Sequence, residues 1–429
     1  MLRLALRSLT LRGRCTLAAG ATAALSGGAL KETDLLRLGL LLLALPLIAG
    51  VLVVRTRFRL TCTRRLEPPR LAAGGRARAV LRIENVSRLP TGLLLIEDTI
   101  PYLLGGRPRV VVERLAPRRP IDVGYHINGE ARGRYNVGPL TVRLLDPFGL
   151  CELPRAFTTV DTLVVTPHVE ALPDTALRGE WGGAGQSTNR AVSTHGDDDV
   201  ATREYRHGDD LRRIHWRTTA RRGELTVRRE EQPWESRAAV LLDARLVAHR
   251  GEGPASSLEW AISAAASVSR HLAQRGFDVR LVTDTGGEVS SSTLGAAGFD
   301  GAMLDVLAAL EPSTGQTLHV GVDSTRRVGG QGLIVAIVGT IQAEDAERLA
   351  RLRAADRCTG VVFMLDTDTW APAPTTARTS DHGLAVGLLA AAGWRVVEVR
   401  RGDSIARLWG DLSATAPPEP AVTETAVAQ

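Results

Sequence analysis

The feature that most constrains this chain is an apolar run near its start, Leu35–Val54, with the sequence LLRLGLLLLALPLIAGVLVV. Only Arg37, close to its beginning, interrupts the run. At a rise of about 1.5 Å per residue, a helix of this length crosses a lipid bilayer. Pro46 is tolerated within such a helix. The run therefore predicts a membrane anchor.

The segment just before this run, Cys15–Leu30, is also apolar but rich in alanine, glycine, serine and threonine. Together with the arginines ahead of it, this segment could be a signal peptide. We favour a second transmembrane helix, because a stronger span follows within a few residues and the two would form a helical hairpin. Arginines flank both ends of the hairpin: Arg3, Arg7, Arg12, Arg14, Arg55, Arg57, Arg59, Arg64 and Arg65.

This distribution of charge predicts the topology, since positively charged flanks stay in the cytoplasm. We therefore expect a multi-pass protein of the cell membrane, with residues 1–59 in contact with the lipid bilayer and the soluble domains facing the cytoplasm. The alternative, a cleaved signal peptide, would weaken or reverse that orientation.

Length and composition point to several folded units. A chain of 429 residues is too long for one ordinary domain, and 44% apolar with 23% charged residues is typical of globular proteins. The net charge of +6 favours a membrane surface over nucleic acid, because the basic excess is greatest near the N-terminus. The four cysteines lie far apart and form no CxxC pair, which argues against a zinc site or a disulfide framework.

Residues 60–168 read as a β-sandwich-like domain. Short alternating runs such as ARAVLRIEN and GPLTVRLLD are separated by glycine and proline turns, for example Asp146–Leu150. This pattern predicts an antiparallel sandwich, which could serve as a binding surface or as a spacer. Residues 169–202 look like a flexible connector, since Gly182–Gly185 lacks the spacing of a phosphate loop. The acidic turn His195–Asp199 is more typical of a solvated turn than of a cation site.

Residues 236–411 alternate between strands and helices. Continuous apolar runs such as RAAVLLDA and GLIVAIVG suit central parallel strands, and amphipathic segments lie between them. The expected fold class is thus α/β plus all-β, with a doubly wound α/β domain whose ligands, if any, bind at the carboxyl ends of its strands. The last segment, 412–429, is rich in proline, alanine and threonine and is expected to be disordered.

Residues 203–235 form the densest cluster of charge in the chain. An N-cap at Asp209 or Asp210 and apolar residues at helical spacing predict a short helix that ends at Gly223. Trp216 is expected to be a packing anchor, and ELTVRREE to be an edge strand leading to the sheet. The motif residues singled out for structure or interaction are Arg203, Tyr205, Gly208, Asp209, Asp210, Arg212, Ile214, His215, Trp216, Ala220 and Arg221.

Three interpretations of this motif remain open. Arginine–carboxylate forks fix geometry, which favours a structural latch between two domains, or else a docking surface for a protein. An anion or nucleic-acid site is the third interpretation, although the interleaved acids would cancel much of the field that attracts phosphate. Catalysis by His207 or His215 is a minor alternative, because no nucleophile with suitable spacing accompanies them.

The order of these features resembles a known family. The hairpin anchor, the β-domain with RGRYNVGPLTVRLLDPFGL (Arg132–Leu150), the motif Arg203–Glu231 and the following AVLLDAR together resemble the bacterial domain-of-unknown-function-58 family. The resemblance implies a von Willebrand factor A-like domain and a non-enzymatic adaptor or scaffold in cell-envelope assembly. It implies a MoxR-type AAA+ ATPase as partner, and in some members a transglutaminase-like membrane protein. No cofactor and no nucleic acid are expected.

The resemblance also raises the question of a metal. A von Willebrand A-type site needs an Asp-x-Ser-x-Ser loop after its first strand. Here Asp243 stands at the first position, but Arg245 and Val247 occupy the two serine positions. Asp243 alone binds a hard cation poorly, so we expect a degenerate site without a metal.

Overall fold

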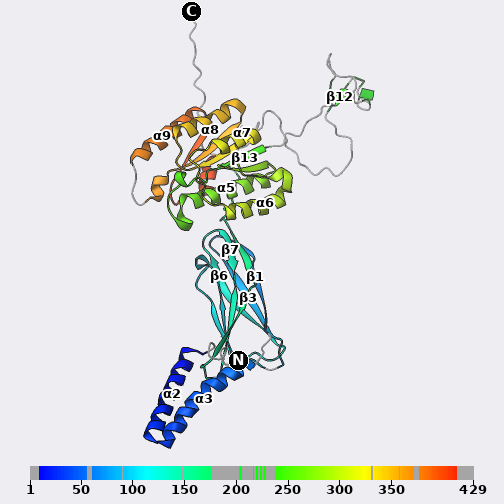
Figure 1. The fold of residues 1–429 in the computed structure, drawn as a ribbon. Helices are drawn as coiled ribbons and strands as arrows, with labels where there is room; N and C mark the ends of the chain where they lie inside the picture. Colours follow the sequence, from blue (N-terminus) through cyan, green and yellow to red (C-terminus); the bar gives the residue numbers. More distant parts are fainter. Residues whose placement is uncertain are drawn as a thin grey trace, which may run out of the picture. The chain divides into compact units, whose positions relative to one another are not determined.

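The computed structural model describes residues 9–55, 60–88, 90–146, 148–174, 202–204, 216, 219–220, 223–224, 226–228, 237–329, 332–356, 358–371 and 376–412. The chain divides into two compact units (Figure 1). The first contains the N-terminal helices and the β-domain, and the second contains the α/β domain. The predicted disorder of 412–429 and the predicted connector lie almost wholly outside the described residues.

The first unit begins with a helical hairpin. Helix α2 (Leu11–Leu30) starts at Thr10, whose hydroxyl accepts a hydrogen bond from the Gly13 N–H at 3.2 Å. Lys31 then takes a left-handed conformation that ends α2, and α3 (Thr33–Arg55) returns antiparallel to it. Glycines let the two helices approach, because a side chain on Gly39 would collide with the backbone of Ala24.

Only part of the predicted anchor is supported by the composition of these helices. Among the described residues, Thr33–Val51 within α3 is the one stretch long and apolar enough to cross a membrane. Helix α2 contains the expected segment Cys15–Leu30, but its small and polar residues make it too weakly apolar to qualify. The expectation of two membrane spans is therefore supported for one helix only.

The β-domain is a sandwich of three sheets. Their strand orders are β1-β3-β6, β5-β4-β8-β9 and β2-β10-β7. The strands are β1 (Leu60–Glu67), β2 (Arg70–Ala72), β3 (Gly75–Asn85), β4 (Leu93–Asp98), β5 (Arg109–Val112), β6 (Pro120–Gly129), β7 (Gly133–Val137), β8 (Leu140–Leu145), β9 (Glu152–Phe157) and β10 (Asp161–Thr166); a short 3₁₀ helix, Tyr102–Leu104, follows β4. Alternate residues of β3 are buried, as a half-exposed strand requires.

The antiparallel prediction holds for this domain except at one pair. β2 and β10 run parallel, with Leu71 opposite Val165. Leu71 and Val165 belong to one apolar core with Ile127, while Leu81, Ile96 and their neighbours form another. The β1-β3-β6 sheet contributes to both cores, so it packs against the other two sheets.

A buried ion pair links these sheets. Arg64 on β1 donates through Nε to Asp98 Oδ2 at 3.0 Å and through Nη2 to Asp98 Oδ1 at 2.7 Å. The Tyr125 hydroxyl donates to Asp98 at 2.5 Å, and Arg64 Nη1 donates to Asp161 at 2.8 Å. Burial would lower the pKa of Arg64, but its hydrogen bonds with Asp98 outweigh this and raise it. The charged groups of this cluster find their hydrogen-bond partners within the β-domain, which indicates a structural role.

The second unit is built on a six-stranded sheet with the order β15-β14-β13-β16-β17-β18 (Figure 1). All its neighbours are parallel except β15, which pairs antiparallel with β14 at one edge. The strands are β13 (Arg237–Leu242), β14 (Asp278–Thr283), β15 (Glu288–Ser290), β16 (Leu333–Val338), β17 (Thr359–Leu365) and β18 (Arg395–Val399). The first strand in the chain, β13, lies in the middle of the sheet. The strands β14 and β15 follow on one side of it, and the chain then crosses to β16 on the other side.

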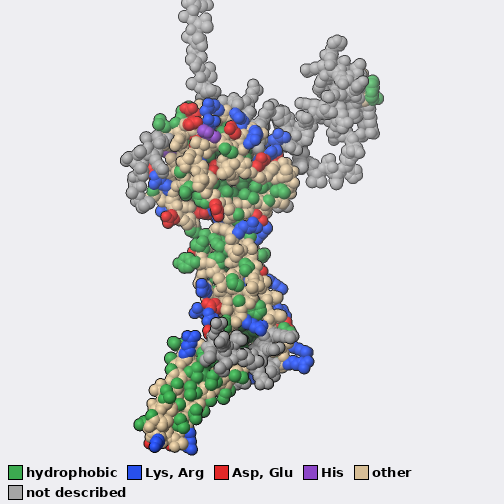
Figure 2. Space-filling view, viewed as in Figure 1, with side chains coloured by type: hydrophobic (Ala, Val, Ile, Leu, Met, Phe, Trp, Pro, Cys, Tyr) green, Lys and Arg blue, Asp and Glu red, His purple; other side chains and the backbone are tan. Residues whose placement is uncertain are grey.

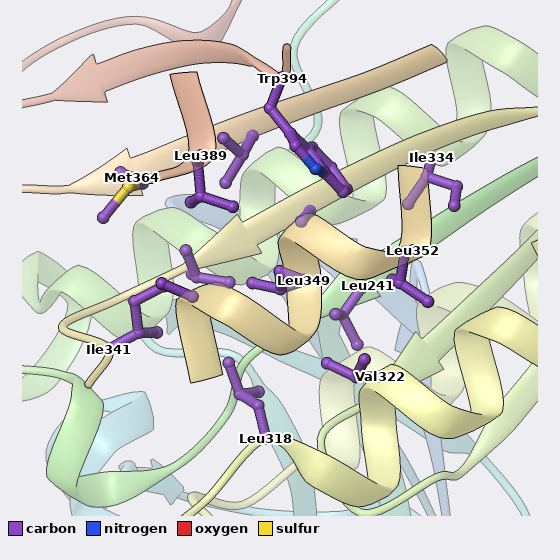
Figure 3. Packing of buried hydrophobic residues seen from close by; sticks show 14 of the residues in the cluster. Leu241, Leu318, Val322, Ile334, Ile341, Leu349, Leu352, Met364, Leu389 and Trp394 are labelled. Carbon is purple, nitrogen blue, oxygen red and sulfur yellow. The ribbon is translucent and has the colours of Figure 1, made fainter. Parts of the chain in front are cut away.

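Helices cover both faces of this sheet. They are α5 (Ser257–Gln274), α6 (Ser291–Ala309), α7 (His319–Gly329), α8 (Ala343–Asp356), α9 (Thr376–Ala391) and α10 (Ile405–Asp411). Figure 3 shows one of the two resulting cores, where Leu349 of α8 and Leu389 of α9 lie over Ile334 and Met364 of the sheet. On the opposite face, Trp409 of α10 stacks on Phe363 at 6.4 Å between ring centroids. The predicted α/β architecture is confirmed.

Candidate functional site

The charged motif of residues 203–235 is described only in pieces. Arg203 lies on β11 (Thr202–Glu204), which pairs antiparallel with β12 (Thr226–Arg228). Within ELTVRREE, Thr226–Arg228 is thus a strand, as expected, and it pairs with β11 in a sheet of two strands. Trp216 is 67% exposed, which contradicts its expected role as a packing anchor.

The helix predicted within this motif is partly confirmed. Trp216 and Ala220 are helical, and Gly223 takes a left-handed conformation with its N–H 2.9 Å from the Thr219 carbonyl oxygen. The remaining residues singled out in the motif lie outside the described residues: Tyr205, His207, Gly208, Asp209, Asp210, Arg212, Ile214, His215 and Arg221. The latch, docking and anion-binding interpretations therefore all remain predictions.

A second candidate site lies where β13 ends. Asp243 follows this central strand directly, and its N–H donates to Ile337 O of β16 at 3.0 Å. Parallel strands bring their carboxyl ends to one edge of a sheet, and ligands of open α/β sheets bind at that edge. Asp243 therefore stands at the position where a binding or catalytic group is expected.

An arginine two residues further along the chain occupies this position with Asp243. Arg245 donates to Asp243 Oδ1 through Nε and to Asp243 Oδ2 through Nη2, both at 2.9 Å. This is a bidentate fork, the strongest geometry for an arginine–carboxylate pair. Arg245 is only 1% exposed and Asp243 is fully buried. The ion pair is therefore almost completely shielded from water.

A second carboxylate completes the cluster. Arg245 Nη1 donates to Asp345 Oδ2 at 2.9 Å and to the Gln316 carbonyl oxygen at 2.9 Å. Asp345, itself 2% exposed, lies in the first turn of α8, where the helix dipole favours negative charge. Its other oxygen accepts the Leu318 N–H at 3.0 Å. Each charged group of this Arg245 cluster thus has several hydrogen-bond partners.

The electrostatics of the Arg245 cluster follow from these contacts. Burial alone would lower the pKa of Arg245, but the hydrogen bonds and charge of Asp243, followed by Asp345, outweigh it and raise the pKa. His249 lies beside the cluster, with Nε2 2.8 Å from the Asp243 carbonyl oxygen and Nδ1 3.0 Å from the Ser257 hydroxyl. Burial lowers the pKa of His249 more than Asp243 raises it, so the imidazole is neutral at pH 7.

This arrangement decides whether a divalent cation fits. A hard cation needs several oxygen ligands around an accessible space. Here the guanidinium of Arg245 engages both oxygens of Asp243 and one of Asp345, and it carries the positive charge that a metal would otherwise supply. The residues present do not fit a metal. Across the described residues no group of three or more His, Cys, Asp or Glu side chains is placed to hold one.

Two acids of this edge were not identified from the sequence. Asp284 follows β14 as Asp243 follows β13, and its carboxylate accepts from Ala244 N at 3.2 Å and from the Ser313 hydroxyl. The shared pattern, an aspartate directly after a buried strand, was available as a signal. Asp345 carried a weaker signal, an acid in the first turn of the helix after β16.

Three exposed apolar side chains lie close in the chain to residues of the buried Arg245 cluster. Leu246 follows Arg245 and is 62% exposed, although its backbone is held by Ser313 O at 2.9 Å. Val247 next to it and Val320 in the first turn of α7 are also exposed. Leu246, Val247 and Val320, which we call the apolar rim, are exposed apolar side chains close to this closed polar centre, and they suit contact with a protein better than capture of a small charged ligand.

Comparisons with known proteins agree with part of the sequence-based resemblance. Residues 201–369 match the family model described as "Protein of unknown function DUF58". This range covers the charged motif and the Arg245 cluster. A Bacillus subtilis (strain 168) protein, "Uncharacterized protein YeaD", is 24% identical over 235 residues. The matched region is 54% of this chain and 57% of that protein, so the chain covers little more than half of that relative.

Three of the solved structures that show similarity to this chain each cover about a quarter of it. A chain of the complex of Zinc 2-glycoprotein and Prolactin inducible protein from human seminal plasma has 15% identity and a TM-score of 0.21, covering 26% of this chain and 97% of that one. The CARDB domain of a Pyrococcus furiosus protein has 17% identity and a TM-score of 0.19, covering 25% and 91%. The putative ApaA protein of Bordetella pertussis has 13% identity and a TM-score of 0.18, covering 25% and 93%. Scores this low carry no argument.

Proposed function

We propose that this chain is a membrane-anchored, non-enzymatic adaptor whose α/β unit is a von Willebrand A-like domain with a degenerate metal site. The observation that supports this proposal best is the closed Arg245 cluster. Enzymes of open α/β folds place their reactive groups at the carboxyl ends of the strands. In this chain the Arg245 guanidinium at that edge is bonded to the carboxylates of Asp243 and Asp345 below the surface, with Arg245 1% exposed.

The partner that we propose is a MoxR-type AAA+ ATPase, as the family resemblance implies, acting in cell-envelope assembly. A transglutaminase-like membrane protein is a further partner in this proposal. The apolar rim of Leu246, Val247 and Val320 is our candidate docking surface for the ATPase. Its centre is desolvated and its apolar side chains are exposed, as in the cores of protein interfaces.

A binding experiment with purified proteins tests this proposal. Full-length protein in detergent is mixed with the MoxR-type ATPase of the same cells, and binding is measured by co-purification. We expect Leu246→Asp with Val320→Asp to abolish binding, because two buried charges at an interface cost several kcal/mol. The matched control is Leu384→Asp, an equally exposed leucine of α9. Equal binding by all three proteins would contradict the proposed docking surface.

Two further measurements address enzymatic activity and topology. Hydrolase or transferase activity that His215→Ala abolishes, in a variant that still folds, would contradict a non-enzymatic role. Reporter fusions after residue 70 test the orientation, for which we expect a cytoplasmic signal. A periplasmic or extracellular signal would instead support a single span preceded by a signal peptide.

A further inference from the structure

The end of the β-domain next to the helical hairpin is fixed to the hairpin by several contacts. Leu9 pairs with Cys151 in an antiparallel bridge, and the Thr10 N–H donates to the Leu150 carbonyl oxygen at 2.9 Å. From the other helix, the Pro46 carbonyl oxygen lies 3.6 Å from Cys151 Sγ. A side chain on Gly13 would collide with the Leu150 carbonyl, so the glycine allows this close approach. The turn before Cys151 therefore lies level with the first turn of α2.

Two other loops lie at the same end of the β-domain. Strand register establishes this, since Asn85 at the end of β3 is opposite Leu60 at the start of β1. The loops 86–92, 113–119 and 146–151 all follow or precede strand ends of this side. Hydrogen bonds join the first two, from Arg118 N to Asn85 O at 2.8 Å and from Thr91 N to Leu115 O at 3.0 Å. Together these loops surround the end from which the hairpin leaves.

This end of the β-domain is strongly basic. Its loops and the first turn of α2 carry six exposed arginines against one exposed acid, Glu113. Asp146 is buried and accepts the N–H groups of Phe148 at 3.0 Å and Cys151 at 2.6 Å, so it is occupied within its own turn. Figure 2 shows Lys and Arg side chains on both sides of the place where the hairpin meets the β-domain. The six arginines, which we call the basic rim, are Arg12, Arg14, Arg88, Arg114, Arg118 and Arg119.

An exposed aromatic residue accompanies the basic rim. Phe148 is 62% exposed in the turn that contacts Thr10, beside Leu11, which is also exposed. A phenylalanine beside arginines at the end of an apolar helix is the composition of a membrane interface. The hairpin below it is covered with apolar side chains (Figure 2). The position, the charge and the apolar side chains of this surface are thus all those of a membrane interface.

We propose that the basic rim binds the headgroups of anionic lipids in the leaflet where the hairpin meets the β-domain, with Phe148 inserted among them. This inference rests on the proposed membrane anchoring. The β-domain is then held against the bilayer by its own surface as well as by the helices. Each arginine close to an anionic leaflet strengthens lipid binding by about fivefold, and salt screens the effect.

Site-specific photo-crosslinking of the full-length protein in lipid nanodiscs tests this inference. A benzophenone amino acid replaces Phe148, and lipid adducts are identified by mass spectrometry in bilayers of phosphatidylcholine with one fifth phosphatidylglycerol. We expect an adduct at this position. The control site is Tyr102, which follows the other end of β4 and is 94% exposed, and there we expect none. Equal adducts at both sites, or none at Phe148, would overturn the inference.

A third site separates this inference from the proposed anchoring. Leu40 is exposed in the middle of the apolar part of α3, so a benzophenone there must crosslink to lipid if α3 spans the bilayer. An adduct at Leu40 without one at Phe148 defeats only the lipid-binding rim. The absence of an adduct at Leu40 defeats membrane anchoring itself and the inference with it.

Charge reversal tests the preference for anionic lipid. Arg118→Glu with Arg119→Glu is expected to lower the ratio of phosphatidylglycerol to phosphatidylcholine in the adducts at Phe148 by at least about 25-fold at low salt, about fivefold for each arginine lost. The matched control reverses Arg76 and Arg107, two exposed arginines toward the other end of the β-domain, and leaves the ratio unchanged. An unchanged ratio in the Arg118 and Arg119 variant would refute anionic headgroups as the ligand of the rim.

Discussion

Replacement of Arg245 by methionine is the sharpest test of how the α/β unit is held together. Methionine has a similar length but no charge, so the change removes the guanidinium and creates little empty volume. Asp243 is 0% and Asp345 2% exposed, and between them they accept three side-chain hydrogen bonds from Arg245. Loss of one partner of a buried ion pair costs about 3–5 kcal/mol, since the remaining charge has no compensation. We expect a loss of this size at pH 7.

Tryptophan fluorescence during urea denaturation measures this loss selectively. All seven tryptophans lie after residue 169, and Trp260, Trp370, Trp394 and Trp409 belong to the α/β domain, so the signal does not come from the membrane anchor or the β-domain. The matched control is Arg351→Met on α8, where an exposed i,i+4 pair with Glu347 is involved. Exposed pairs of this kind contribute about 0–1 kcal/mol, so the control should unfold almost as the wild type does.

The pH dependence provides the internal check. Protonation of a carboxylate removes the uncompensated charge of the Arg245→Met variant, so its deficit relative to wild type should shrink as the pH falls from 7 toward 4. The wild type also loses stability in this range. The pKa of His249 is lower in the folded state than its usual 6.5, so folding excludes a proton that the unfolded state binds, and stability falls as the pH drops below 6.5. Besides burial, the charge of Arg245 is itself one cause of the lowered pKa of His249, so its removal weakens this acid-sensitive loss and also shrinks the deficit as the pH falls. A deficit below about 1 kcal/mol at pH 7, or one that does not change with pH, would refute the reasoning.

Three further predictions concern metal, thiol reactivity and helix packing. We expect no stoichiometric Mg²⁺ binding by calorimetry in the wild type, and Mg²⁺-dependent stabilisation in Arg245→Ser, where two carboxylates lose their internal cation. Burial raises the pKa of Cys62 to about 11, so its alkylation by iodoacetamide should rise about tenfold per pH unit between pH 8 and 10, as peptide mass spectrometry would record. Gly39→Leu should separate α2 from α3, and crosslinking between cysteines introduced on the two helices should then be lost. Gly28 has open space around it, so Gly28→Leu should leave this crosslinking unchanged. Equal crosslinking in both variants would contradict the packing.

The sequence predicted those parts of the fold in which each strand or helix carries its own periodic signal. The run that became β16 is buried along its whole length and the run that became β13 is buried after Arg237, and their apolar composition alone indicated central parallel strands. β9 was not predicted, because Pro154 interrupts it. The fold tolerates this proline since β9 is the edge strand of its sheet. The parallel pairing of β2 with β10 depends on contacts between distant segments, and no local pattern encodes it.

In the candidate site too, features with a local signal were found from the sequence and contacts between distant segments were not. The family resemblance drew attention to Asp243, and to Arg245 and Val247 at the two positions where the resembled motif has serines. It did not identify what Arg245 does. Asp345 lies 100 positions away from Arg245, and only the fold brings it within 2.9 Å of the guanidinium. Trp216 was misjudged for a related reason, since a large aromatic residue in a helix predicts burial only when a partner surface covers it.

The Arg245 cluster also constrains how any partner can bind at this edge of the sheet. With the guanidinium held by two carboxylates and a carbonyl, no charged group of the cluster is left to coordinate a ligand or a bridging cation. In our proposal docking uses the apolar rim, which buries nonpolar surface without exchanging ions. Association through Leu246, Val247 and Val320 should therefore be insensitive to chelators and only weakly dependent on salt. The basic rim of the β-domain should show the opposite behaviour, because its attraction to anionic headgroups is screened by salt. One salt titration with both readouts separates the two surfaces.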